Sequence, residues 1–173
     1  MGAEGVTIAI DPAARGFAWA RYDGGVLVGC GNIPKADLER VLPDRGARWV
    51  METPQNYGTF GVAHGDLDKL RDTLREIEVW ARSNGGTISY VKPFTWKGNV
   101  PKQIQHKRVF AILGETEQAI VGKPYGAKYD HNTYDAVALG LWASGRAGRG
   151  STNATGGNTA DNSRNGSKLE NGQ

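Results

Sequence analysis

The first third of the chain alternates apolar and polar positions in short runs, a pattern that predicts β-strands. Residues 6–10 are apolar and rich in β-branched side chains. They favour a buried strand that ends close to Pro12, because proline cannot donate a hydrogen bond to a strand ladder. In the next run, residues 17–22, side chains of one face alternate with those of the other. One face takes Phe17, Trp19 and Arg21, and the other takes Ala18, Ala20 and Tyr22. The two runs therefore predict a hairpin.

The rest of the chain alternates between the two periodicities. We expect strands at 26–28, 48–52 and 87–91, a short helix at 35–41, and a loop at 54–64. A helical period starts at Asp66 and ends at the glycine pair 85–86, and a second covers 101–113. Asp135 is expected to open a last helix, which is apolar on all sides and therefore buried. This order predicts an α/β fold, a mixed sheet flanked by helices.

The length of 173 residues suits a single domain, which we place at residues 1–147. Residues 148–173 are rich in Gly, Ser, Asn and Thr, lack periodicity, and are expected to form a disordered polar tail. No apolar run resembles a signal peptide or a spanning helix, so no membrane partner is expected. The lone cysteine, Cys30, excludes an internal disulfide and a multi-cysteine zinc site. A cytoplasmic location, in a bacterium or a phage-infected host, is the expectation.

The net charge of +3 is unevenly distributed along the chain. Residues 1–85 carry 10 Lys and Arg against 12 Asp and Glu, whereas residues 86–149 carry 9 against 4. A basic excess confined to one part of the chain is what a polyanion-binding face requires, although solvated basic faces are also common.

Three acids, Asp11, Glu52 and Asp135, stand at the ends of predicted elements. Each has a structural explanation by itself: a turn after Asp11, an exposed strand end at Glu52, or a favourable helix start at Asp135. Taken together, they suggest carboxylates that converge on one point. Carboxylates that converge need a cation, and oxygen ligands suit Mg²⁺, with Mn²⁺ as an alternative.

These acids and their surroundings resemble a known family. Asp11 in IAIDPAARG, Glu52 in WVMETP and Asp135 in HNTYDAVALGLW are similar to the acids of RuvC-type Holliday-junction resolvases, especially the phage forms, of the ribonuclease H-like superfamily. The resemblance implies a ribonuclease H-like fold and a homodimer that cleaves four-way DNA junctions in recombination and repair. It also implies two Mg²⁺ ions, roughly 3.5–4 Å apart, that activate a water and stabilise the leaving oxygen.

The resemblance leaves the fourth metal ligand open, because the family usually has Asp or His where this chain has Asn132. His131 and Asp130 are the catalytic candidates, and Asn132 offers its carbonyl oxygen. His131 is the preferred hypothesis, since it lies within a helical turn of Asp135.

A basic stretch after the strand at 87–91 resembles the family's nucleic-acid contacts. We expect phosphate contacts from Lys92, Lys97, Lys102, Lys107 and Arg108. Tyr57 and Phe60, on the loop after Glu52, are candidates for stacking on an unpaired base, with core packing as an equal alternative. His64 and His106 receive no role.

Two other functions remain open at this point. One is a nuclease of the same fold that acts on RNA or unbranched DNA, and the other is a nucleic-acid-binding module without catalysis. The three acids favour cleavage, because a protein that only binds has no reason to gather negative charges near phosphates.

Overall fold

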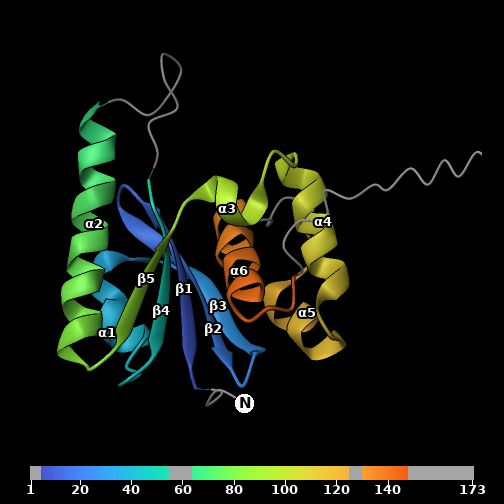
Figure 1. Ribbon diagram of the computed structural model, residues 1–173, viewed down its shortest axis with the longest axis horizontal. Coiled ribbons are helices and arrows are strands. Elements are labelled where there is room, and N and C mark those ends of the chain that lie inside the picture. The colour runs from blue at the N-terminus through green and yellow to red at the C-terminus, as the bar shows by residue number, and fades with distance from the viewer. Residues whose placement is uncertain (1–4, 55–63, 125–129, 148–173) are drawn as a thin grey trace, which may run out of the picture.

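The computed structural model describes residues 5–54, 64–124 and 130–147. Its centre is a five-stranded sheet in the order β3-β2-β1-β4-β5, with helices on both faces (Figure 1). The elements in chain order are β1 Thr7–Ala13, β2 Gly16–Asp23, β3 Val26–Pro34, η1 Lys35–Asp37, α1 Leu38–Val41, β4 Arg48–Glu52, α2 His64–Ser83, β5 Thr87–Val91, α3 Pro93–Lys97, α4 Lys102–Ile112, α5 Glu115–Val121 and α6 His131–Ala143. The predicted mixed sheet flanked by helices is confirmed.

β1 is the central strand and makes the predicted hairpin with β2. The two strands are antiparallel, and Asp11 pairs with Ala18. On its other side β1 runs parallel to β4, and the last pair is Ile10 with Met51. β1 continues to Ala13 rather than ending near Pro12 as expected. Because Pro12 lies beyond the last pair with β4, it stands at the margin of the sheet, where proline is tolerated.

β3 is much longer than the three residues expected for it and reaches Pro34. Its glycines make room for the side chain of Trp19 on β2. A Cβ atom at Gly29 would lie 3.2 Å from the indole ring of Trp19, and one at Gly31 would lie 3.4 Å from it. The bulky side chain on one strand therefore explains the small residues on the next.

The alternation predicted for β2 is confirmed by the two cores of the molecule. Phe17 and Trp19 pack in the cluster with α1 and α2, whereas Ala18, Ala20 and Tyr22 pack in the cluster with α6. Figure 1 shows α1 and α2 on one side of the sheet and α6 on the other, with α4 and α5 beyond it. Small side chains on the second face let α6 approach the sheet closely.

Gly140 marks the closest approach of α6 to the sheet. A Cβ atom at this position would lie 2.0 Å from a ring carbon of Tyr22. The hydroxyl of Tyr22 donates a hydrogen bond to the carbonyl oxygen of Val137 at 2.6 Å. The residues Thr133 to Leu141 are all buried, which confirms the prediction of a buried last helix.

The prediction that Asp135 opens α6 is wrong. The helix starts at His131, and Asp130 is its N-cap residue. Asp130 accepts hydrogen bonds from the backbone N–H groups of Asn132 and Thr133 at 3.0 and 3.4 Å. The first turn is polar and lacks the apolar pattern that begins at Ala136, so the pattern alone placed the start one turn too late.

The helices at 35–41, 66–84 and 101–113 and the strands at 48–52 and 87–91 are confirmed within one or two residues. The short helices α3 and α5 were not predicted. The predicted loop at 54–64, with Tyr57 and Phe60, lies outside the described residues except for its two end positions. The predicted tail at 148–173 lies wholly outside them. Among the helices in the described part, none has the length and hydrophobicity to span a membrane.

Candidate functional site

Asp11 and Glu52 lie side by side in the sheet and face α6. Each follows the last pair between the parallel strands β1 and β4. Ala9 and Val50, two positions earlier, pack in the cluster that includes α6. Because side chains alternate along a strand, Asp11 and Glu52 point to the same face as these two residues. The sheet thus delivers two carboxylates to one point.

Asp135 completes the group from α6, at the beginning of the second helical turn. Asp135 is 3% exposed. Burial and the negative charges of Glu52 and Asp135 raise the pKa of Asp11 well above its ordinary range. The charge contributions from Glu52 and Asp135 require both carboxylates to lie near Asp11. The structure therefore brings together the three acids that the sequence singled out.

Glu52 is held by two neighbouring residues of α3. The indole Nε1 of Trp96 donates a hydrogen bond to Oε2 at 2.9 Å, and Nζ of Lys97 lies 3.1 Å from the same oxygen. Lys97 also lies over the ring of Trp96, 4.9 Å from its centroid. Burial raises the pKa of Glu52, and the charge and hydrogen bonds of Lys97 oppose this effect.

Asp135 is held in the same manner by two residues of α4. Nε2 of His106 lies 2.8 Å from Oδ1, and Nζ of Lys102 lies 2.8 Å from Oδ2. Burial alone would raise the pKa of Asp135, but the hydrogen bonds from His106 and Lys102 hold the pKa below its ordinary value. Asp135 is therefore a stable carboxylate, and since such oxygens only accept, Nε2 of His106 is the donor.

The other predicted basic residues lie further from the acids. Lys92 is exposed at the N-cap of α3, and Lys107 and Arg108 are exposed on α4. These three side chains do not contact the carboxylates in the described residues. They lie on or next to the two helices that carry Lys97 and Lys102.

The candidates for a fourth ligand all lie at the start of α6. His131 and Asn132 are four and three residues before Asp135, which puts both on the same side of the helix as Asp135. His131 is exposed and Asn132 is half-buried. Both oxygens of Asp130 accept hydrogen bonds from the first turn, including one at 2.9 Å from the Thr133 hydroxyl. Its capping role occupies Asp130 in this arrangement.

A divalent cation fits the chemistry of this group, although the side chains do not stand in a ligand shell. In the described part of the chain, no three His, Cys, Asp or Glu side chains are spaced to hold a metal ion. The oxygen donors nevertheless suit Mg²⁺ or Mn²⁺. A cation would also offset the repulsion from Glu52 and Asp135, which adds to the effect of burial on the pKa of Asp11.

Trp96 and His106 were missed as site residues by the sequence analysis. Their partners Glu52 and Asp135 are 44 and 29 residues away in the chain, so no local pattern reveals the contacts. One signal was available for His106. It follows Lys102 by four residues in a predicted helix, which places the two side chains on one face.

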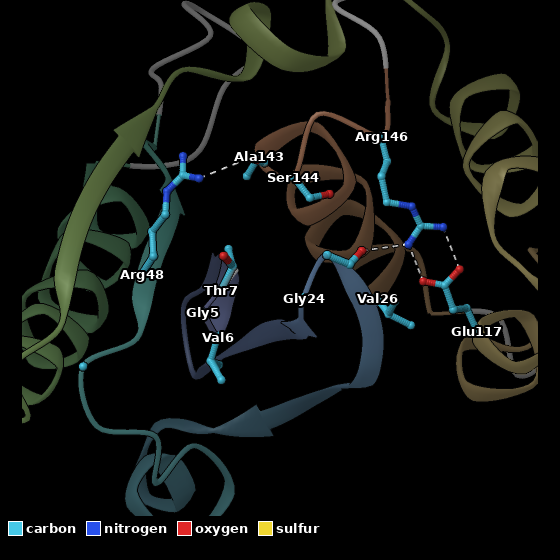
Figure 2. Close-up of a pocket in the computed structure, with 12 residues that line it drawn as sticks. Gly5, Val6, Thr7, Gly24, Val26, Arg48, Glu117, Ala143, Ser144 and Arg146 are labelled. Carbon is cyan, nitrogen blue, oxygen red and sulfur yellow. Dashed lines mark hydrogen bonds and ion pairs between the residues drawn. The ribbon is translucent and has the colours of Figure 1, made fainter. Parts of the chain in front are cut away.

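A cleft of about 690 Å³ lies at the other end of the strands (Figure 2). Thr7 and Arg48, the first residues of β1 and β4, line it together with Ser144 after α6. Arg146 joins its wall through an ion pair with Glu117 and a hydrogen bond to the carbonyl oxygen of Gly25 at 2.9 Å. Because β1 and β4 are parallel, this cleft is separate from the acids at their carboxyl ends.

The chain is similar to known proteins in its fold but not in its sequence. No family model and no curated protein sequence matches the chain. Among solved structures, fowlpox virus resolvase in complex with substrate Holliday-junction DNA superposes with a TM-score of 0.54 and 16% identity, over 80% of this chain and 96% of that one. RuvC of Thermus thermophilus superposes with a TM-score of 0.50 and 17% identity, over 79% and 91%. The chain therefore shares the ribonuclease H-like fold of these Holliday-junction resolvases, as the motifs around its three acids predicted.

Proposed function

We propose that this protein is a metal-dependent endonuclease that cleaves phosphodiester bonds in branched DNA, with the four-way junction as its substrate. This proposal rests on the convergence of Asp11, Glu52 and Asp135 at the carboxyl ends of β1 and β4. Lys97 and Lys102 lie beside these acids. A fold shared with two Holliday-junction resolvases agrees with it.

In the reaction, a water oxygen attacks the phosphorus and the bond to the 3′ oxygen breaks. Asp11, Glu52 and Asp135 would hold Mg²⁺ or Mn²⁺ beside the phosphate, with a further ligand from the start of α6. When bound, the ions lower the pKa of the attacking water and stabilise charge on the leaving oxygen. His131 remains our preferred fourth ligand over Asp130, because the Asp130 carboxylate already caps α6.

The two lysines give the site a second means of stabilising charge. Lys97 and Lys102 lie close to the carboxylates, and Lys102 is half-exposed, so its ammonium group can reach a phosphate oxygen. A cation fixed near the scissile phosphate stabilises the extra negative charge of the transition state more than that of the ground state. The same lysines reduce the repulsion between the acids and the incoming DNA.

The exposed basic residues of α3 and α4 extend this surface. Lys92, Lys107 and Arg108 are exposed and would contact the DNA backbone without reading its sequence. Symmetrical cleavage of a four-way junction requires two copies of the site, so we propose that the protein acts as a homodimer. Tyr57 and Phe60 stay candidates for stacking on an unpaired base.

One experiment separates this proposal from its alternatives. The protein is incubated with a labelled four-way junction, a linear duplex of the same sequence, and an RNA hairpin, each with Mg²⁺ and with chelator. We expect cleavage of the junction only, and only with Mg²⁺. Preferential cleavage of the duplex or RNA would assign another nuclease function, and binding of the junction without cleavage would identify a binding module.

The fourth ligand is tested with three variants, His131→Ala, Asn132→Ala and Asp130→Ala, at saturating Mg²⁺. We expect the His131 variant to lose most of its cleavage. An active His131 variant beside an inactive Asp130 variant would transfer the role to Asp130.

A further inference from the structure

We propose that Trp96 and His106 are positioning residues that orient Glu52 and Asp135 for metal binding. This inference rests on the proposed function and adds two residues to it. The observation behind it is a repeated arrangement. Each carboxylate receives one lysine ammonium group and one ring N–H. The two donors to Glu52 come from α3, and the two donors to Asp135 come from α4.

On α3, adjacent residues supply the two contacts to Glu52. Trp96 is 8% exposed, so its indole N–H is directed to Oε2 of Glu52 in a place with little competing water. An uncharged donor fixes the direction of the carboxylate and leaves its negative charge in place for a cation. The Lys97 ammonium group packs on the ring of the same tryptophan, so Trp96 orients both members of the pair.

On α4, residues one helical turn apart supply the two contacts to Asp135. His106 is fully buried, at 0% exposed, and its ring packs against that of Tyr134, with centroids 5.2 Å apart. Its Nε2 binds Oδ1 of Asp135, while Lys102 binds Oδ2. Because the side chain of Lys102 is half-exposed and that of His106 is fully buried, His106 is the more tightly packed partner of the two.

The two kinds of partner suggest a division of labour. The lysines are able to transfer from the carboxylate to a phosphate or give way to a cation. The rings are buried in the protein and stay in place, so they keep one oxygen of each carboxylate engaged and the other directed toward the site. Partners that fix ligating carboxylates typically change metal affinity or activity by about 10- to 100-fold when they are removed.

The test compares Trp96→Phe with Trp80→Phe. The first keeps an aromatic ring and the contact with Lys97 but removes the hydrogen bond to Glu52. The second removes an indole hydrogen bond of the same kind, from Nε1 of Trp80 to the carbonyl oxygen of Leu42 at 3.3 Å, on the opposite face of the sheet. Two quantities are measured for each variant. One is the rise in melting temperature as Mg²⁺ is titrated without DNA, and the other is single-turnover junction cleavage against Mg²⁺ concentration.

We expect Trp96→Phe to raise the half-saturating Mg²⁺ concentration about 10-fold or more in both measurements, with cleavage restored at saturating Mg²⁺. Trp80→Phe should lower the melting temperature without moving this concentration. For His106, the Gln variant keeps an N–H near the position of Nε2 and should resemble the wild type, whereas the Leu variant should resemble Trp96→Phe.

The inference is overturned if Trp96→Phe titrates like the wild type, or if His106→Gln is as impaired as a folded His106→Leu. A wild-type protein that neither responds to Mg²⁺ nor cleaves any substrate is a different result, because it contradicts the proposed function itself.

Discussion

Nζ of Lys102 lies 2.8 Å from Oδ2 of Asp135, and this contact joins the first residue of α4 to the second turn of α6. The lysine side chain is 48% exposed and that of the aspartate is 4% exposed. Water competes with Asp135 for the exposed ammonium group, and His106 also holds the carboxylate, so Lys102 adds little to stability. Its value lies in placing a positive charge at the border between the acids and solvent.

Replacing Lys102 with Met keeps the length of the apolar stem and removes the charge. We expect the single-turnover rate of junction cleavage to fall about 100-fold, as for loss of other charge-stabilising donors, while the melting temperature changes little. Quenched time points of the cleavage reaction measure the rate, and thermal unfolding measures the melting temperature. Cleavage by Lys102→Met at the wild-type rate would remove this lysine from the reaction.

Replacing Asp11 with Asn should abolish cleavage and leave junction binding intact or stronger, because a ligand and a negative charge near the phosphate are both lost. Gel-shift binding and cleavage assays on the same junction test this directly. A variant that cuts at nearly the wild-type rate would refute the metal site.

The same substitution should also stabilise the protein in chelator. Folding raises the pKa of Asp11, so ionisation opposes folding once the pH exceeds the unfolded pKa of about 3.9. At neutral pH Asp11→Asn removes this cost, and the melting temperature should rise by about 2–4 °C for each kcal/mol regained. A lower melting temperature would show that the Asp11 carboxylate is stabilising. Asp72→Asn, the same exchange at an exposed position on α2, serves as the control.

Lys107→Ala and Arg108→Ala should each weaken junction binding without changing the rate at saturation. If each side chain contacts one phosphate, the slope of log affinity against log salt concentration should fall in magnitude by about 0.9 per variant. Lys35→Ala is the matched control, because Lys35 pairs with Glu76 on the opposite face of the sheet. Unchanged slopes would place the DNA elsewhere.

Glu117 gives a prediction for acid stability. The ion pair with Arg146 and the backbone N–H groups of Leu27 and Gly114 lower the pKa of Glu117 to about 2. Its stabilisation is therefore complete above the unfolded pKa of about 4.3 and is lost as the pH falls toward 2. Glu117→Gln should lower the free energy of unfolding by roughly 2–3 kcal/mol at pH 7. The stability of this variant should also depend less on pH between about 4 and 2. Denaturant unfolding at several pH values measures this, and an unchanged pH dependence would contradict it.

The sequence predicted the fold well where local pattern and tertiary environment agree. Alternation along β2 sorted its side chains correctly between the two cores, and the all-apolar run after Asp135 identified the buried helix. It failed where a distant residue decides the local structure. The strand predicted at 26–28 continues to Pro34, and nothing near Gly29 and Gly31 indicates that Trp19 of the neighbouring strand lies over them.

The candidate site was predictable to a similar extent. Asp11 and Glu52 were found because each ends an apolar run, and the order of the three acids pointed to their convergence. The orientation of the acids was not predictable, since it depends on Trp96 and His106, which approach from helices far along the chain. The start of α6 was misplaced because capping by Asp130 uses polar residues that carry no periodic signal.

The spacing between Asp11 and Glu52 is set by the alignment of two backbones, since each residue follows the pair Ile10 with Met51. Insertion or deletion of a single residue in either strand would turn one carboxylate toward the opposite core. The site should therefore accept many exchanges of neighbouring side chains but no change in strand length. The alignment of the two carboxylates therefore depends on the number of residues in each strand and not on most of their identities. A fold shared at 16–17% identity is compatible with this dependence.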